Sequence, residues 1–357
     1  MLTTDLERGG LPLRVAKLAP RLRDFGVEPV VGCLAPPGPL SAELERQGVR
    51  TFSCAAAGPF DATCLIRLAR HVRGIDPDLV HASLFHANLA ARLICRLDCP
   101  RPIITSTVTI EIERLWHRWL ESATAGLTDV HVANSRAVAD HLMIDLGFPA
   151  DRVVVMPNAI DLAEIDATPP IDRRAAGLQD GAQIILWAGR MDPVKDLPIF
   201  VSVIERLRDR ANLIAVLLGD GPDRHRIEAC VARAGVGGLI RFKGWSHEVV
   251  AWLKAADLLL FPSRTEGCPN VVLEAMASGC PVVAGDVPGC RELIDSGIDG
   301  LLCPVGDVEA FAAAVEHLLC DIPKAKRIVG AARTKALARN DLNQAAERWA
   351  RLYQSLV

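Results

Sequence analysis

The chain has 357 residues, 50% of them hydrophobic, which is more than one average domain needs and predicts two domains. Its formal net charge of -3 excludes the strong basic field that is typical of nucleic-acid-binding proteins. The eleven cysteines are scattered, and Cys33, Cys95 and Cys280 lie among apolar residues, as small buried side chains do. We therefore expect a reducing, cytoplasmic compartment rather than a disulfide framework.

A membrane association is indicated only weakly by the sequence. The first residues lack the pattern of a signal peptide, and no apolar run reaches the roughly 20 residues that cross a bilayer. Arg67, Arg70, His71 and Arg73 form a local basic stretch, which is best interpreted as the solvated face of a helix. The alternative is a patch for an anionic acceptor or for peripheral contact with the inner face of the membrane.

Short β-rich runs alternate with longer amphipathic stretches in the first 165 residues, which predicts a parallel sheet covered by helices. The predicted strands are Val27–Leu34, Leu79–Ala82, Ile103–Thr107, Asp129–Ala133 and Val153–Met156. The predicted helices are Leu11–Phe25, Leu65–Arg73 and Ser135–Leu146. A first strand should precede the Gly9-Gly10 turn, yet only Met1–Thr4 stand before it. Either that strand is very short or the natural start lies upstream.

The rhythm breaks at Asn158–Gly181, where Pro169 and Pro170 and little apolar periodicity predict a linker. A second alternating series follows, with strands predicted at Ile184–Ala188, Leu213–Leu218, Leu239–Phe242, Leu258–Phe261 and Pro281–Ala284. We expect domains at 1–165 and 166–340, and an amphipathic helix within 341–357 that packs back on the first domain. Doubly wound domains bind ligands beyond the carboxyl ends of their strands, which predicts a site in a central cleft that both domains face.

Two glutamates mark the most informative segment. Glu266 lies on a loop at the carboxyl end of a predicted strand, and Glu274 lies about one turn into a helix that begins near Asn270. The unpaired amides at the start of such a helix attract an anion such as a diphosphate. The two carboxylates can then accept hydrogen bonds from hydroxyls on either side of it. Taken alone, two such glutamates are more often a helix cap and a surface ion pair.

This E-x7-E pattern stands within PSRTEGCPNVVLEAMASGCPVVAGDVPG, which resembles the signature of glycosyltransferase family 4, the group 1 glycosyltransferases. The resemblance covers nearly the whole chain and is strongest from Ile184 to Val305. It implies an α/β fold of the GT-B type, with two Rossmann-like, doubly wound domains facing a central cleft. It also implies retaining transfer of a sugar from a UDP- or GDP-sugar to a glycan, a lipid-linked acceptor or another hydroxyl acceptor, with no cofactor and no bound metal.

The resemblance also assigns residues of the second domain. WAGRMDPVKD, residues 187–196, looks like the donor-phosphate loop, in which Gly189 permits close approach and Arg190 and Lys195 hold the diphosphate. FKGW resembles the segment that faces the nucleotide base, where Trp245 either packs or stacks. Glu274 would bind the ribose hydroxyls. Glu266 would hold the transferred sugar and its phosphate together with the five residues that follow, Gly267, Cys268, Pro269, Asn270 and Val271. The catalytic candidates are Glu266, Arg190 and Lys195.

The first domain resembles the family less sharply. Gly9 and Gly10 look like the glycine pair beside donor phosphate and acceptor. His81 and His86 are hydrogen-bonding candidates, although a histidine at a strand end is more often structural. Many family members place a histidine after the next strand, whereas this chain reads TSTVTIE at 105–111. The substitutes we consider there are Thr109, Glu111 and Glu113.

Three other classes of protein were compared with a transferase. A nucleotide-sugar epimerase would need an acid/base set and would convert sugar without an acceptor. The very short first strand and the lack of a histidine in residues 105–111 suggest a non-catalytic protein that binds nucleotide sugars. The missing G-x-G-x-x-G fingerprint argues against a nicotinamide dehydrogenase. For the transferase, retention is expected through same-face attack, because no enzymatic nucleophile is placed for double displacement.

Overall fold

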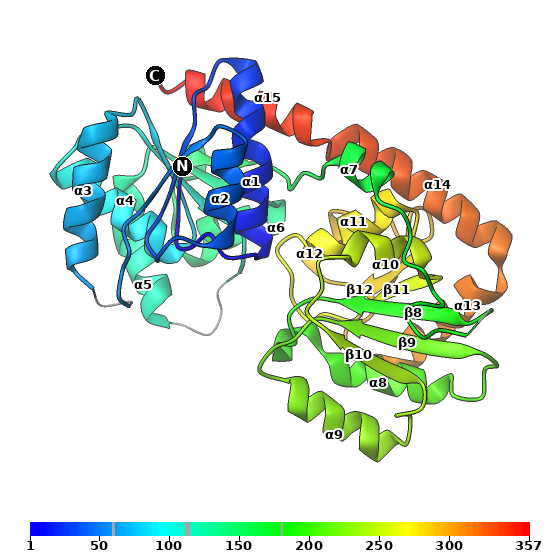
Figure 1. The fold of residues 1–357 in the computed structure, drawn as a ribbon. Helices are drawn as coiled ribbons and strands as arrows, with labels where there is room; N and C mark the ends of the chain where they lie inside the picture. Colours follow the sequence, from blue (N-terminus) through cyan, green and yellow to red (C-terminus); the bar gives the residue numbers. More distant parts are fainter. Residues whose placement is uncertain (59–60, 111–114, 180) are drawn as a thin grey trace. The chain divides into compact units, whose positions relative to one another are not determined.

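The computed structural model describes residues 1–58, 61–110, 115–179 and 181–357 (Figure 1). The chain forms two compact units, of which the first is Met1–Ala159 together with Leu342–Val357 and the second is Ile160–Asp341. The corresponding boundaries predicted from the sequence were residues 165 and 340. The last helix, α15 (Leu342–Gln354), belongs to the first unit and packs against α1 (Gly10–Leu22).

The first unit is built on a parallel sheet whose strands, within the described residues, follow the order β3-β2-β1-β4-β5-β6-β7. The chain therefore winds outward in one direction from β1 and in the other from β4, which makes the β1/β4 boundary a topological switch point. The first strand has two residues, as its short sequence allowed. The strands are β1 Leu2–Thr3, β2 Val30–Cys33, β3 Arg50–Ser53, β4 Val80–Ser83, β5 Ile103–Thr107, β6 Val130–Ala133 and β7 Val153–Val155.

Helices connect these parallel strands and bury their apolar faces on the sheet (Figure 1). The predicted helix Leu11–Phe25 ends its α-helical part at Leu22, and a 3₁₀ turn then leads to Gly26, whose φ of +77° ends the helix. Besides α1 and α15, the helices are α2 Pro39–Arg46, α3 Thr63–Ile75, α4 Phe85–Leu97, α5 Leu115–Thr124 and α6 Arg136–Asp140, which a π-helical turn at His141–Asp145 extends.

Two arginines of the basic stretch on α3 are paired with acidic residues within the chain. Arg67 contacts Asp61 at 2.6 Å, and Arg73 forms an ion pair with Asp98. These pairs reduce the positive charge that α3 offers to an anionic partner, which favours the interpretation of this stretch as an ordinary solvated face. No helix in the described ranges is long and apolar enough to span a bilayer.

A buried arginine joins α4 to α5. The side chain of Arg92 is 1% exposed, and its Nη1 donates to Glu121 Oε2 at 2.6 Å. Its Nε donates to Thr128 Oγ1 at 2.9 Å, and Nη1 also reaches Thr124 Oγ1 at 2.9 Å. Several donors of one guanidinium are thus satisfied inside the unit, as a buried charge requires.

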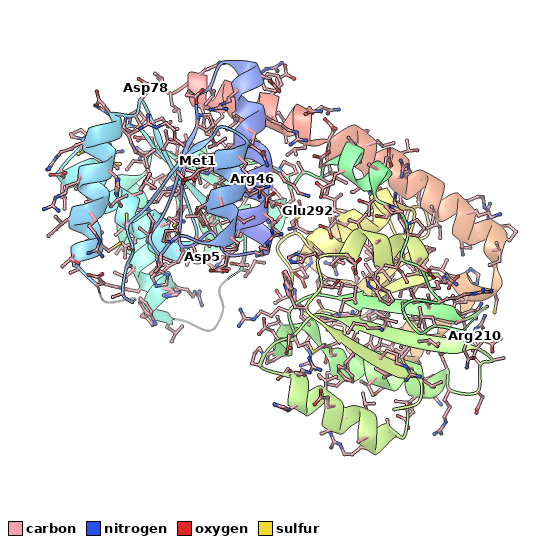
Figure 2. All side chains as sticks on the ribbon, viewed as in Figure 1. Met1, Asp5, Arg46, Asp78, Arg210 and Glu292 are labelled. Carbon is pink, nitrogen blue, oxygen red and sulfur yellow. The ribbon has the colours of Figure 1, made fainter. Side chains whose placement is uncertain are left out.

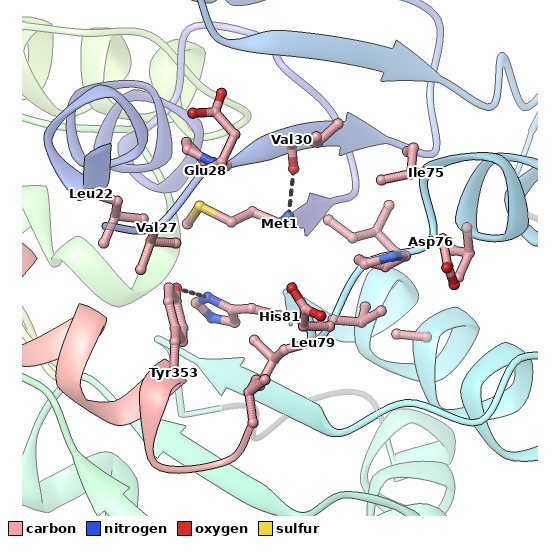
Figure 3. A pocket seen from close by; sticks show the side chains of 18 of the residues that line it. Met1, Leu22, Val27, Glu28, Val30, Ile75, Asp76, Leu79, His81 and Tyr353 are labelled. Carbon is pink, nitrogen blue, oxygen red and sulfur yellow. Dashed lines mark hydrogen bonds between the residues drawn. The ribbon is translucent and has the colours of Figure 1, made fainter. Parts of the chain in front are cut away.

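A second buried network docks α15 on the sheet. His81 Nδ1 is hydrogen-bonded to Tyr353 Oη at 2.6 Å (Figure 3). Its Nε2 is hydrogen-bonded to Ser106 Oγ at 2.7 Å, and the ring stacks on Trp349. Burial, together with the positive charges of the Met1 amino group and Arg14, lowers the pKa of His81 to about 3. Burial also lowers the pKa of His131 to about 3. Both imidazoles are therefore neutral in the folded chain at neutral pH.

We expect acid to destabilise the first unit through His81. Its pKa is about 3 when folded and about 6.5 when unfolded, so its contribution is complete above pH 6.5 and is lost as pH falls towards 3. Between pH 7 and pH 5 the free energy of unfolding should fall by about 2 kcal/mol more in the parent than in His81→Gln, which cannot titrate. Urea unfolding at both pH values measures this difference. Equal losses in parent and variant would contradict the assignment.

A cavity of about 530 Å³ lies in the first unit at the amino ends of the strands (Figure 3). Its lining includes Val30 and Val80, which begin β2 and β4. The Met1 amino group donates to Val30 O at 2.6 Å, and burial lowers the pKa of this amine to about 5. Because the cavity adjoins the amino ends of the strands, it lies at the sheet edge opposite to the one where doubly wound sheets bind ligands.

The second unit has its own parallel sheet, with the order β10-β9-β8-β11-β12-β13 among the described residues and a switch point between β8 and β11. Its strands are β8 Gln183–Ala188, β9 Leu213–Leu218, β10 Ile240–Gly244, β11 Leu258–Phe261, β12 Val282–Gly285 and β13 Leu301–Cys303. Its helices are α7 Leu162–Ala167, α8 Leu197–Arg206, α9 Arg224–Ala234, α10 Val249–Ala255, α11 Asn270–Ser278, α12 Pro288–Arg291, α13 Val308–Cys320 and α14 Ile322–Arg339.

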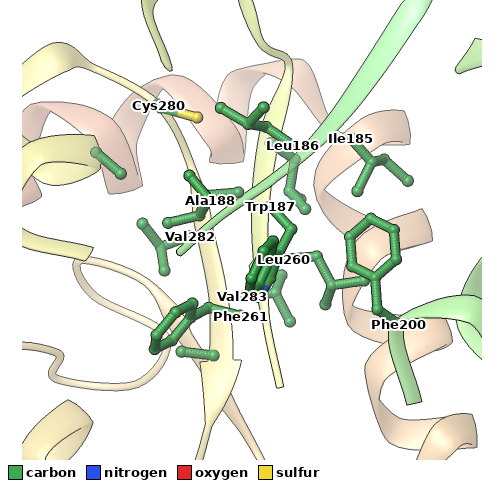
Figure 4. Packing of buried hydrophobic residues seen from close by; sticks show 14 of the residues in the cluster. Ile185, Leu186, Trp187, Ala188, Phe200, Leu260, Phe261, Cys280, Val282 and Val283 are labelled. Carbon is green, nitrogen blue, oxygen red and sulfur yellow. The ribbon is translucent and has the colours of Figure 1, made fainter. Parts of the chain in front are cut away.

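The core of the second unit surrounds its central strands (Figure 4). Trp187, Phe200 and Phe261 are almost fully buried there, and β8, β11 and β12 are near-continuous apolar runs because helices cover both faces of the sheet. Arg210, labelled in Figure 2, marks the amino edge of this sheet, where its Nε donates to Gln183 Oε1 at 2.6 Å.

The predicted linker Asn158–Gly181 contains a short helix, α7, that the sequence analysis did not foresee. Asp161 caps it by accepting a hydrogen bond from the amide of Glu164 at 3.1 Å, and Ile165 is buried against the second unit. Six residues are too few for a visible apolar period, so this helix depends on its cap and on one buried contact.

Candidate active site

The predicted donor residues gather at the switch point of the second sheet. β8 and β11 are hydrogen-bonded neighbours, and the loops that follow them are residues 189–196 and 262–269. The carboxyl ends of both strands meet at this edge, where strand order reverses and leaves room for a ligand. The two loops carry Lys195 and Glu266 respectively.

Lys195 and Glu266 form an ion pair. Lys195 Nζ lies 2.6 Å from Glu266 Oε1, and the two side chains are only 19% and 10% exposed. The ammonium also lies 5.5 Å from the centroid of the Phe261 ring, within the range of a cation–π contact. Each charge thus neutralises the other in a partly buried place. An incoming anion can compete for the lysine, and a polyhydroxylated ligand can compete for the carboxylate.

Two glycines allow the loops of this edge to approach one another closely. Gly219 has φ +131°, and a Cβ on it would overlap the carbonyl oxygen of Gly189. A Cβ on Gly289, in α12, would overlap the carbonyl oxygens of Glu266 and Gly267. Backbone packs directly on backbone at both places, so any larger residue would displace the loops that carry the site.

Helix α11 begins directly beside Glu266. Its N-cap is Pro269, which has no side-chain acceptor for the first amides of the helix. Those amides and the positive end of the helix dipole favour an anion. Glu274 lies in the second turn of α11 and is half-buried. In the loop, Gly267 and Pro269 are buried, whereas Cys268 and the first helical residues, Asn270 and Val271, are partly exposed.

Arg190 and Trp245 lie more openly than the other predicted donor residues. Arg190 follows the exposed Gly189, and its side chain is 72% exposed with Nε 3.2 Å from Asp192 Oδ2. Trp245 follows β10, is 55% exposed and meets His247 edge-on at 3.9 Å between ring centroids. The sequence allowed Trp245 either to pack in the core or to stack on the base. Its exposure is inconsistent with packing in the core.

In the first unit the predicted residues lie in different environments. Gly9 is the N-cap of α1, and Gly10 is its exposed first residue. Thr109 is exposed beyond β5, whereas Glu111, like Glu113, lies outside the described residues. His86 is half-buried at the start of α4, with its ring centroid 5.6 Å from that of His117.

His81 is buried inside the first unit. It is 4% exposed, and both of its ring nitrogens are hydrogen-bonded inside the unit. It therefore helps to hold α15 rather than presenting a nitrogen to a ligand. The reason is its partner Tyr353, which lies 272 residues later in the chain and which no local pattern could indicate.

Two further residues beside the predicted site, Asp196 and Arg264 of the second unit, were not predicted from the sequence. Arg264 stands two residues before Glu266, and Asp196 directly follows Lys195. Their opposite charges beside the two predicted site residues were the available signal. Across the residues that the structure describes, no group of three or more His, Cys, Asp or Glu side chains is arranged to hold a metal ion.

Two family models match this chain, one for each half. The model for Glycosyltransferase Family 4 matches residues 8–164, and the model for Glycosyl transferases group 1 matches residues 182–321. The chain belongs to the group 1 glycosyltransferases. The family resemblance stated from the E-x7-E segment is thereby confirmed.

Curated relatives of this glycosyltransferase act on several kinds of acceptor. It is 28% identical to a 2-deoxystreptamine N-acetyl-D-glucosaminyltransferase of Streptomyces fradiae, over 93% of this chain and 87% of the relative. It is 33% identical to a lipopolysaccharide core biosynthesis mannosyltransferase of Rhizobium meliloti. That second match covers 57% of this chain and 62% of the relative, less than two thirds of its length.

Solved structures show the fold. HepE of Anabaena, solved in complex with UDP-glucose, superimposes with a TM-score of 0.85 at 22% identity over 99% of both chains. Sucrose-phosphate synthase of Thermosynechococcus elongatus has a TM-score of 0.84 at 20% identity, over 99% of this chain and 98% of that one. The predicted α/β fold of the GT-B type, with two Rossmann-like domains, is confirmed for this glycosyltransferase.

Proposed function

We propose that this glycosyltransferase retains the anomeric configuration while it transfers a hexosyl or N-acetylhexosaminyl group from a UDP- or GDP-sugar to a hydroxyl acceptor. The observation that carries the proposal is the Lys195–Glu266 pair at the β8/β11 switch point, beside the start of α11. A cation, a carboxylate and helix amides stand together at this place. The cation and the amides suit the phosphates of a sugar diphosphate and the negative charge that develops on them as they leave, and the carboxylate suits the sugar hydroxyls.

Each residue then has a distinct role. The α11 amides and Lys195 would hold the diphosphate, with Arg190 able to reach it from its exposed position. Glu266 would accept hydrogen bonds from hydroxyls of the transferred sugar, and Glu274 from the ribose. Trp245 would lie beside the nucleotide base. Binding of the donor separates Lys195 from Glu266 and gives each of them a new partner.

The chemical step follows from this placement. The acceptor oxygen attacks the anomeric carbon on the face from which the diphosphate departs. The bond from that carbon to the phosphate oxygen breaks, and the acceptor proton passes to the departing phosphate oxygen. Lys195 and the amides stabilise the negative charge that develops there. An inverted anomer in the product, observed by NMR, would contradict this course.

The acceptor is proposed to be a glycan or lipid-linked hydroxyl, or the ring hydroxyl of a cyclic polyol. Support comes from the names of the relatives, which include transferases to 2-deoxystreptamine and to D-inositol 3-phosphate and enzymes of the lipopolysaccharide core. A lipid-linked acceptor would bring the enzyme to a membrane surface. Co-sedimentation with anionic vesicles tests that contact, which the paired arginines of α3 do not favour.

A donor screen tests the proposed function. UDP-glucose, UDP-GlcNAc, UDP-galactose and GDP-mannose are each added to the parent chain and to Glu274→Ala. A donor present at 100 times its Kd should stabilise the folded parent by about 2.7 kcal/mol, seen as a rise in Tm of about 5–10 °C. The variant should lose most of that rise, because a ribose contact is gone. Turnover with acceptors follows for the donor that binds.

The same screen separates the alternatives. Conversion of the sugar without any acceptor would indicate a nucleotide-sugar epimerase. Binding of a donor without turnover on any acceptor would indicate a non-catalytic protein. Neither alternative is favoured by the family models, which describe transferases.

A further inference from the structure

A second ion pair joins the same two loops of the second unit. Arg264 Nε donates to Asp196 Oδ2 at 2.7 Å, and Arg264 Nη2 donates to Asp196 Oδ1 at 3.2 Å. A guanidinium that holds both oxygens of a carboxylate in this way fixes their orientation as well as their distance. The amide of Arg264 also donates to the carbonyl oxygen of Val194 at 2.8 Å. Asp196 adjoins Lys195, and Arg264 stands two residues before Glu266.

Asp196 is held in an unusual conformation. Its φ is +49° and its ψ 43°, the left-handed region that residues other than glycine seldom adopt and that Asp and Asn tolerate best. Its side chain is 4% exposed, whereas that of Arg264 is 61% exposed. Such a conformation persists where surrounding contacts determine it. The two hydrogen bonds from the Arg264 guanidinium hold this buried carboxylate.

We propose that Asp196 and Arg264 are positioning residues that keep Lys195 and Glu266 correctly spaced during sugar transfer. This inference rests on the proposed function. Lys195 and Glu266 are bonded to each other at 2.6 Å. When a donor binds, each of them turns to the ligand, and their bond to each other is lost. The Asp196–Arg264 pair stays formed and keeps the two loops that carry Lys195 and Glu266 aligned.

This role has a kinetic signature. Contacts to the departing diphosphate strengthen in the transition state, so a displaced Lys195 lowers kcat more than it weakens ground-state binding. The proposed contacts to the base and ribose lie elsewhere, at Trp245 after β10 and at Glu274 on α11, and do not depend on the Asp196–Arg264 pair. KM for the donor should therefore change little.

Asp196→Asn and Arg264→Ala test the proposal. Asn keeps the shape of Asp and its tolerance of the left-handed conformation but removes the charge, and Arg264 is exposed enough for alanine to be accommodated. Both variants should lower kcat by about 10- to 100-fold, the cost of a displacement of about 1 Å, with KM for the nucleotide sugar within about threefold. Arg264→Lys keeps the charge without the two paired hydrogen bonds and should show an intermediate kcat.

Arg210→Ala is the matched control (Figure 2), because it removes an arginine from the amino edge of the same sheet. It should lower Tm and leave kcat unchanged. If Asp196→Asn and Arg264→Ala behave in the same way in an active parent, the pair is merely structural and this inference alone is overturned. If the parent neither binds nor transfers any nucleotide sugar, the proposed function fails and the inference fails with it.

Discussion

Replacing Lys195 by alanine is expected to lower kcat by about 10²–10³-fold, the usual cost of removing one group that stabilises charge in the transition state. The reason is the position of Lys195 Nζ at the β8/β11 switch point, where the proposed diphosphate leaves. Initial rates with saturating nucleotide sugar and acceptor measure the effect. Glu266→Gln should also lower kcat, because an amide accepts hydrogen bonds from sugar hydroxyls less strongly than a carboxylate.

Folding must be separated from catalysis in this experiment. Each single variant leaves its partly buried partner without the opposite charge, so Tm should fall in both. Lys254→Ala is the matched control, because that lysine lies on α10 and donates to the carbonyl oxygens of Asp166 and Thr168, away from the site. A folded Lys195→Ala enzyme with the kcat of the control would contradict the proposed role.

Replacing Arg92 by methionine is expected to cost the first unit about 3–5 kcal/mol of folding free energy, as breaking a buried ion pair does. Methionine restores much of the volume of the arginine, but it leaves Glu121 without its charged partner and Thr128 without its donor. Urea unfolding followed by the fluorescence of the tryptophans measures the loss. A thermal melt should show the same loss as a Tm lower by about 6–20 °C.

A double variant identifies the cause. Arg92→Met with Glu121→Leu removes both charges, and it should recover most of the lost stability because apolar groups can replace a buried pair at little cost. If the double variant is as unstable as the single one, lost packing explains the effect and the ion pair does not. Sugar transfer at a temperature where all three chains are folded should be unchanged.

Much of the architecture could be predicted from local patterns. Four predicted strands lie in strands of the structure, namely Ile103–Thr107, Ile184–Ala188, Leu213–Leu218 and Leu258–Phe261. A short apolar run that ends in a turn has few alternatives to forming a buried parallel strand. The same reasoning placed Glu266 on a loop and Glu274 in the helix that follows, since Asn270 begins α11 as expected.

Other features depend on contacts between distant parts of the chain. The six-residue α7 has no visible period. Met1–Thr4 contributes only the two residues of β1, yet that strand lies inside the sheet between β2 and β4, and strand order of this kind cannot be read from one segment. Arg92 is buried because α5 encloses it together with Glu121, which lies 29 residues later in the chain.

The sequence by itself determined the family, the alternation of strands and helices and the residue types of the candidate site, because motifs and hydrophobic periods are local. Only the tertiary structure decided which of those residues meet. Lys195 and Glu266 are 71 residues apart in the chain and become partners because β8 and β11 are neighbours where the strand order reverses. His81, a candidate for hydrogen bonding to a ligand, is enclosed by Tyr353 because α15 returns to the first unit. Pairing and burial are decided by chain topology, which no single segment of sequence contains.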